Sequence, residues 1–181
     1  MKRVLSLLGA ALVFQTFMAQ GAPEGGIEGK KAPLWEVEEW EQLPKGKKSL
    51  ELTDFKGKTV YLYAFQSWCP GCHSHGFPTL KAVQKRFKND KDVVFVAVQT
   101  VFEGHETNTM ARGLATLKKF GLKIPLGLSG SKAKPSKLMR QYRTRGTPWT
   151  IIIDKGGKVV SNGFRVDADE AIALIEKSTK S

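Results

Sequence analysis

The sequence has few cysteines, few long apolar runs and, over one long segment, no acidic residues. Its 181 residues include only two cysteines, which allow at most one bridge. After roughly the first twenty residues, no stretch is apolar over the length that a membrane-spanning helix needs. Internal repeats and low-complexity tracts are also absent. What remains is the composition of one ordinary globular domain, 41% hydrophobic and 25% charged.

The N-terminus resembles an export signal. Lys2 and Arg3 precede an apolar run from Val4 to about Ala19, and small residues follow it. We predict a secretory signal peptide over 1–21, a flexible lead-in over 22–33 and one domain over 34–181. The absence of cysteine near the junction excludes lipidation there. The mature chain is predicted to be extracytoplasmic, with no membrane span after signal cleavage, and an uncleaved anchor is the alternative.

Hydrophobic patterning predicts alternating strands and helices. Apolar runs and alternation indicate strands over 59–66, 93–98, 124–128, 149–153 and 159–164. Apolar residues at helical spacing indicate helices over 71–88, 107–120, 135–142 and 167–177, with Pro78 interrupting the first. Residues 34–43 are expected to form a short strand or turn at the edge of the core. This order predicts an α/β fold with a central mixed sheet and helices on both faces.

Both cysteines lie between the first long strand and the first helix, spaced C-x-x-C at Cys69 and Cys72. Unpaired N–H groups and the helix dipole stabilise a thiolate at such a helix start. A structural bridge between these two residues would close almost no loop and would add little stability. The spacing therefore favours redox chemistry, haem attachment or metal binding over a structural disulfide.

The motifs around this pair resemble those of thioredoxin-fold proteins, most closely the exported TlpA/ResA-like thiol–disulfide oxidoreductases. The resemblance runs from about Lys31 to the end and rests on KAP at 31–33, LTDFKGKTVYLYAFQSWCPGC at 52–72 and GTPWTIIIDKGGKVV at 146–160. It implies a thioredoxin-like fold and a periplasmic, monomeric enzyme that exchanges disulfides with protein substrates. Reduction is favoured over oxidation, with a membrane electron-donor protein as partner and with no dissociable cofactor or metal.

The resemblance also assigns roles to individual residues. Cys69 would be the attacking thiolate, partly exposed, and Cys72 the resolving thiol, so that the two form a redox-active disulfide. Pro148 would be a cis-proline lying against the cysteines, which leaves the backbone of Thr147 free to pair with an extended substrate. Trp68 would contact the substrate or simply pack beside the site.

Three positions depart from the family's pattern. Tyr63 occupies the place where thioredoxins carry a buried acid, and His75 the place where TlpA/ResA-like members often carry a glutamate. Pro78 comes one residue later than in those relatives, so the helix contains one extra residue, and alignment on the proline puts Gly76 at the glutamate position. The usual proton acceptor is therefore missing or replaced. His75 is the candidate proton acceptor, because imidazole exchanges protons near neutral pH, and a plain surface histidine is the alternative.

Other classes of function compete for the same stretch. Cys69, Cys72 and His73 match the C-x-x-C-H signature of c-type haem attachment, although a long buried strand enters the motif. The same residues with His75 offer four metal ligands, but neighbouring helical positions point in different directions. A thiol peroxidase and a non-catalytic binding module with this fold are the remaining alternatives.

Of the net charge of +12, Lys2 and Arg3 contribute two, and the remaining excess comes from one segment. Between Thr107 and Ile153 there are ten Lys or Arg and no acidic residue, whereas the rest of the mature chain holds 17 of each sign. One interpretation is a solvated face. The other is a positive field that Arg143 and Arg145 bring to the cysteine face, where it would steer acidic partners. Nucleic acid is not expected as a partner, because no binding motif is recognisable.

Overall fold

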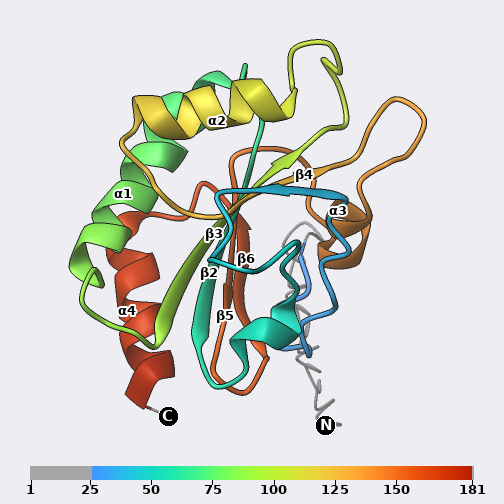
Figure 1. Cartoon of the computed structure of the whole chain (residues 1–181). Helices are drawn as coiled ribbons and strands as arrows, with labels where there is room; N and C mark the ends of the chain where they lie inside the picture. The colour runs from blue at the N-terminus through green and yellow to red at the C-terminus, as the bar shows by residue number, and fades with distance from the viewer. Residues whose placement is uncertain (1–25, 181) are drawn as a thin grey trace, which may run out of the picture.

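The computed structural model describes residues 26–180, so the predicted signal peptide lies outside the described residues. Six strands form one sheet in the order β1-β4-β3-β2-β5-β6 (Figure 1). Their bounds are Glu39–Glu41 (β1), Thr59–Phe65 (β2), Val93–Thr100 (β3), Leu126–Ser129 (β4), Trp149–Ile153 (β5) and Val159–Phe164 (β6). β2, β3 and β4 run parallel, whereas β1, β5 and β6 pair antiparallel with their neighbours. The predicted mixed sheet is confirmed.

β2 lies at the centre of the sheet and carries the chain to the cysteines. All seven of its residues are buried, because neighbouring strands flank it and helices or loops cover both faces. A strand in that position needs apolar side chains throughout, and TVYLYAF supplies them. The prediction of a buried strand over 59–66 is confirmed to within one residue.

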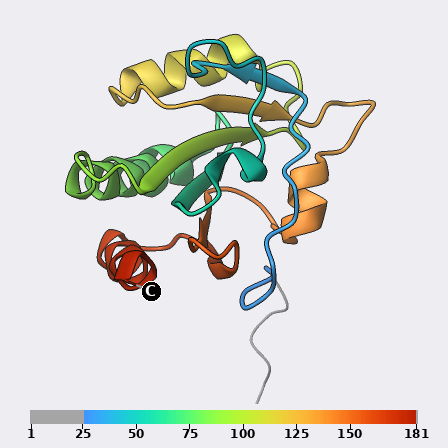
Figure 2. The ribbon, with the colours of Figure 1, turned by 60° about the horizontal axis from the view of Figure 1, so that its bottom comes forward.

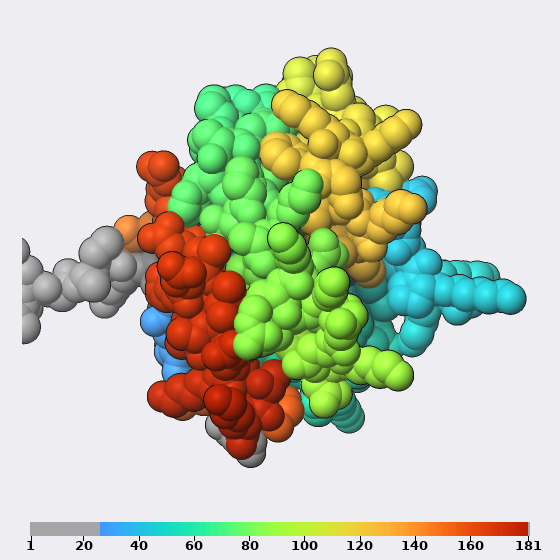
Figure 3. Space-filling view, turned by 90° about the vertical axis from the view of Figure 1, so that its left-hand side faces the viewer, coloured from blue at the N-terminus to red at the C-terminus, as the bar shows by residue number. Residues whose placement is uncertain are grey.

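The helices lie on both faces of the sheet, as predicted. Their bounds are Phe77–Arg86 (α1), Met110–Lys119 (α2), Lys137–Tyr142 (α3) and Ala168–Lys180 (α4). One core cluster joins α1, α2 and α4 to the sheet face that carries Tyr61 and Tyr63, and another joins α3 to the opposite face. Figure 2 shows α1 and α4 on one side of the sheet and α3 on the other, and in Figure 3 α1 and α4 lie side by side.

The helices differ from their predictions at their ends. α2 begins at Met110 rather than Thr107, because Thr109 is extended and its side chain accepts the N–H of Arg112 as an N-cap. The N–H groups of Thr107 and Asn108 instead donate to the Gly104 carbonyl in a turn. α4 continues to Lys180, three residues beyond the predicted end.

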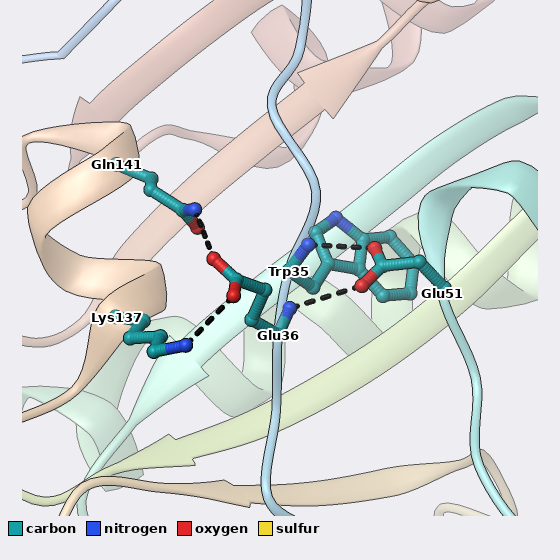
Figure 4. Close-up of polar contacts among 5 residues, drawn as sticks. All are labelled: Trp35, Glu36, Glu51, Lys137 and Gln141. Carbon is teal, nitrogen blue, oxygen red and sulfur yellow. Dashed lines mark hydrogen bonds and ion pairs between the residues drawn. The ribbon is translucent and has the colours of Figure 1, made fainter.

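Two glutamates hold the segment before β1, and one of them joins it to α3 (Figure 4). The carboxylate of Glu51 accepts the backbone N–H groups of Trp35 and Glu36 at 2.6 and 3.0 Å. The Glu36 carboxylate in turn accepts from Lys137 and Gln141 of α3 at 2.7 and 2.6 Å. Trp35 is fully buried as a result. The short strand expected at the edge of the core is β1.

The lead-in is more extensively packed than a flexible segment would be. Ile27 and Ala32 are buried, and Lys31 forms an antiparallel bridge with Lys158 of the β5–β6 hairpin. Apolar side chains and backbone pairing therefore extend the packed unit back to about residue 26, whereas the domain was expected to begin at 34. Between residues 26 and 180, no helix is long and apolar enough to cross a membrane.

Candidate active site

The two cysteines lie in the first helical turn after β2. The chain becomes helical at Pro70, and the Cys72 N–H donates to the Cys69 sulfur at 3.1 Å. The Cys69 carbonyl accepts the N–H groups of Cys72 and His73 at 3.1 and 3.3 Å. Cys69 is only 6% exposed, so it is more covered than the partly exposed thiol expected from the sequence. Its sulfur thus receives a backbone hydrogen bond that stabilises negative charge on it.

Pro148 lies against this turn from far along the chain. The Thr147–Pro148 peptide bond is cis, as predicted. The Cys69 thiol donates to the Thr147 carbonyl at 3.4 Å. A Cβ added to Gly71 would lie 3.3 Å from Pro148 Cδ, and one added to Gly76 would lie 2.9 Å from Pro148 Cβ. The cis-proline therefore packs on the two glycines that flank the resolving cysteine.

A groove of about 420 Å³ passes over Cys69. Thr147 and Pro148 line it, together with three exposed aromatic side chains, Trp68, Phe102 and Phe164. These are 48%, 42% and 54% exposed, respectively. The sequence singled out Trp68 but not Phe102 or Phe164, because an aromatic residue at a strand end is ordinarily core. Only the fold places them at the rim of one groove.

Cys72 lies beneath Cys69 in a closed environment. It is fully buried, and burial raises the pKa of the Cys72 thiol, with the adjoining Cys69 thiol raising it further. Tyr63 of β2 is also fully buried, and its hydroxyl makes no hydrogen bond of standard geometry among the described residues. Burial, and then the neighbouring Cys72 thiol, raise the pKa of Tyr63 well above its usual range. The tyrosine noted from sequence thus lies directly beside the resolving cysteine.

The extra residue before Pro78 is accommodated by a π-helical turn over Cys72–Gly76. A π turn is the α-helix with one residue inserted, and such turns are frequent at functional sites. Regular α-helix resumes at Phe77, so Pro78, which has no N–H to donate, lies just after the π turn. The interruption expected at Pro78 is therefore present, as the change from π to α geometry at Phe77, one residue earlier.

His75 points toward the loop before α4. Its Nε2 lies 3.3 Å from the Val166 carbonyl and 3.6 Å from the Asp167 carboxylate, and its side chain is 23% exposed. Among residues 26–180, neither sulfur is one of its hydrogen-bonding partners. The structure therefore does not bring the candidate proton acceptor into contact with the cysteines.

His73 is held by other groups. Its Nε2 lies 2.7 Å from the Ser67 carbonyl, and its ring packs against Phe77 and Phe120. A metal site would need several of these ligands to converge, and no group of three or more His, Cys, Asp or Glu does so within the described part of the chain.

A buried polar network supports the loop that carries Trp68. The Ser67 N–H donates to Gln99 Oε1 at 3.2 Å and to Asn108 Oδ1 at 2.9 Å. Asn108 Nδ2 then donates to Gln66 Oε1 at 2.7 Å and to the Glu103 carbonyl at 2.9 Å. These contacts join β2, β3 and the β3–α2 loop. Sequence patterning holds no signal for the contacts that Gln66 and Ser67 make, because their partners Gln99 and Asn108 lie more than thirty residues further along the chain.

The acid-free basic segment borders the site with Arg145 and, in a neighbouring hollow that Trp68 and His73 also line, with Arg112 and Lys119. Arg145 lines the groove with Cys69, whereas Arg143 caps α3 in the left-handed region with φ 52°. Lys137 is already paired with Glu36. The expected approach of cations to the cysteine face is therefore carried by Arg145, and Arg165 from the end of β6 joins it.

Comparison with known proteins agrees with this geometry. Residues 27–175 match the Redoxin family model. The chain is 30% identical to the thiol-disulfide oxidoreductases ResA of Bacillus cereus and Bacillus subtilis over 87% of its length, covering 82% and 79% of theirs. Among solved structures, it is similar to a thioredoxin-like superfamily protein (TM-score 0.74, 33% identity) and to a thiol-disulfide isomerase from Corynebacterium glutamicum (TM-score 0.70, 29% identity). Both matches cover 83% of this chain and 97% of the other.

Proposed function

We propose that this chain, which belongs to the Redoxin family of thioredoxin-fold thiol–disulfide oxidoreductases, exchanges disulfides with protein substrates outside the cytoplasm, with reduction its favoured direction. One observation carries the proposal: the Cys69 sulfur accepts the Cys72 N–H beside the cis Thr147–Pro148 bond, at the floor of a groove. A thiol held in this way can attack a disulfide that enters the groove, with a second thiol directly beneath it.

In the reductive direction, the Cys69 thiolate attacks one sulfur of a substrate disulfide. The substrate S–S bond breaks as a mixed disulfide forms, and the first substrate sulfur leaves and takes a proton from solvent. Cys72 then attacks Cys69 Sγ, and its proton passes to the second substrate sulfur as that sulfur leaves. The substrate gains two electrons and two protons, and a dithiol donor must reduce the Cys69–Cys72 disulfide again.

The groove supports a polypeptide as the substrate. Thr147 lines it beside Cys69, and an extended segment in the groove would pair with the Thr147 backbone. Trp68, Phe102 and Phe164 offer apolar contact around Cys69. Aromatic side chains of this kind provide contact area at low entropic cost.

Export is part of the proposal. A signal over residues 1–21 would carry the chain out of the cytoplasm, and the domain would work there as a soluble monomer. A membrane electron-donor protein is the proposed source of reducing equivalents, following the resemblance to TlpA/ResA-like proteins. No dissociable cofactor takes part in the cycle.

The test combines reduction of insulin by dithiothreitol with a redox equilibration against glutathione. The wild-type protein is expected to accelerate insulin reduction, and Cys69→Ser to fall to the uncatalysed rate. Cys72→Ser should instead accumulate a mixed disulfide at Cys69, detectable by mass spectrometry. An inert wild-type protein that still binds disulfide peptides would identify a non-catalytic binding module.

A further inference from the structure

We propose, on the basis of the function proposed above, that the Tyr63 hydroxyl donates a hydrogen bond to the Cys72 sulfur as that sulfur gains negative charge, and so speeds the second step of the reaction. Tyr63 then serves the resolving thiol as a hydrogen-bond donor, at the position where thioredoxins carry a buried acid.

The ring of Tyr63 has one fixed orientation. It stacks on Phe65 at 5.9 Å between centroids and packs edge-on to Phe77 at 5.1 Å. Both neighbours are fully buried, so the ring cannot swing toward solvent. Its hydroxyl is left at the end of the ring nearest the π turn, beside Cys72 and without another acceptor of standard geometry among the described residues. A buried hydroxyl without a partner is costly, which calls for a physical reason.

Gly76 makes room for that hydroxyl. A Cβ on Gly76 would lie 2.0 Å from Tyr63 Oη and 2.7 Å from Tyr63 Cζ. Any side chain at position 76 would therefore displace the phenol from Cys72. The extra residue of the π turn and the tyrosine are thus complementary, because the π turn places a residue without a side chain against the hydroxyl.

A neutral hydrogen-bond donor beside the Cys72 sulfur suits the second step of the reaction. Burial raises the pKa of Tyr63, so the phenol keeps its proton while the enzyme works. Cys72 must give up its proton to attack Cys69 Sγ, and negative charge then gathers on a sulfur that is fully buried until the new S–S bond forms. A hydrogen bond from a neutral phenol stabilises that charge. The Cys72 proton passes to the departing substrate sulfur, and Tyr63 keeps its own, so the step remains balanced. His75 cannot serve Cys72 in this way while it faces Val166 and Asp167.

The experiment follows the reduced wild-type protein mixed with dithiobis(nitrobenzoate) in a stopped-flow spectrometer. Attack by Cys69 releases one nitrothiobenzoate, and resolution by Cys72 releases the second. In Tyr63→Phe, the first release should keep its wild-type rate, and the second should slow by roughly tenfold to a hundredfold, the effect of one lost hydrogen bond to a charged group. The rate of the second release should also go on rising to higher pH than in wild type, because the Cys72 thiolate forms less readily.

Tyr61→Phe is the matched control. Tyr61 lies two residues earlier on the same buried strand, in the same core cluster, and its hydroxyl contacts Thr150 Oγ1 at 3.4 Å. Removing that hydroxyl should leave both releases unchanged. An unchanged second release in Tyr63→Phe overturns the proposal, as does a slow second release in His75→Ala but not in Tyr63→Phe. Absence of the first release in wild type would instead contradict the proposed function itself.

Discussion

Burial of Cys72 has two opposite effects on its role as the resolving thiol. The thiol is fully buried, and burial raises its pKa, which keeps it protonated and slow to react. The same burial protects the mixed disulfide from competing thiols and holds the resolving sulfur directly below Cys69. The backbone hydrogen bond to Cys69 and the Tyr63 hydroxyl therefore act on opposite members of the pair.

The raised pKa of the Cys72 thiol predicts a loss of stability at alkaline pH. An exposed thiol ionises near pH 9.0, and the folded protein resists that ionisation. Above that pH the unfolded chain binds fewer protons than the folded one, so stability falls, by about 1.4 kcal/mol per pH unit at most. Denaturant unfolding of the reduced protein between about pH 7 and 11 should show this loss.

Cys72→Ala serves as the reference for that measurement. Tyr61 and Tyr63 also have raised pKa values, to about 12 for Tyr61, and both remain in the variant. The difference in unfolding free energy between the two proteins therefore isolates Cys72 and should shrink as pH rises above about 9. A difference that stays constant with pH would contradict the prediction.

Among the elements, the π turn of Cys72–Gly76 fixes the relation between the cysteines and α1. Phe77, Leu80 and Val83 face the core on α1, and the cysteines face the cis-proline. In a regular α-helix, one inserted residue would rotate the side chains that follow it by about 100° around the helix axis. The cysteines could then not face the cis-proline while the apolar side chains of α1 face the core. The π turn accommodates the extra residue within Cys72–Gly76, so both sets of side chains keep their orientation.

Gly76→Ala tests the fit of this turn. In open helical backbone, alanine would stabilise relative to glycine by about 1 kcal/mol, and Gly76 has helical dihedrals (φ −61°, ψ −49°). The overlap of the new Cβ with Tyr63 Oη should outweigh that gain, because overpacking of a fixed core costs about 1–3 kcal/mol. Chemical denaturation should therefore show a less stable protein.

The exposed Ser74 provides the control in the same turn. Ser74→Ala is expected to change the unfolding free energy by no more than about 0.5 kcal/mol. Equal effects at the two positions would mean that the turn, and not the contact with Tyr63, determines the result.

Over the whole molecule, the excess of positive charge lies in the segment that also forms part of the groove over Cys69. The acid-free segment between Thr107 and Ile153 includes α2, α3 and the cis-proline, and it delivers Arg145 to the groove. Cations elsewhere in the segment serve other purposes, such as the pairing of Lys137 with Glu36. The positive field at the site therefore depends on position as well as on net charge.

Arg145→Gln is predicted to weaken turnover of an acidic disulfide peptide by roughly twofold to fivefold at low ionic strength, by loss of electrostatic steering. The difference from wild type should vanish near about 1 M salt, where screening acts over about 3 Å. Lys132→Gln removes the same charge from the same segment, away from the groove, and should have little effect. Equal effects of the two substitutions would identify a solvated surface without a steering role.

The sequence by itself determined the fold class, the reaction type and the position of the cysteine pair. Patterning of period two and 3.6 located the buried strands and the helices, and the C-x-x-C and Gly-Thr-Pro motifs identified the family. Element ends were less predictable: Thr109 as an N-cap delayed α2, and β3 ran two residues further than its apolar run. Caps and strand ends depend on partners that the local pattern does not contain.

Only the tertiary structure decided which groups surround the resolving thiol. Tyr63 and His75 were both conspicuous in the sequence, and the chemistry of imidazole favoured the histidine as proton acceptor. The π turn directs His75 toward Val166 and Asp167, and it places Gly76 over the Tyr63 hydroxyl. These relations join a strand, a helix turn and a cis-proline loop that are distant along the chain. Because burial and contact across the sheet set the environment of Cys72, its proton chemistry follows from the packed structure and not from the motif.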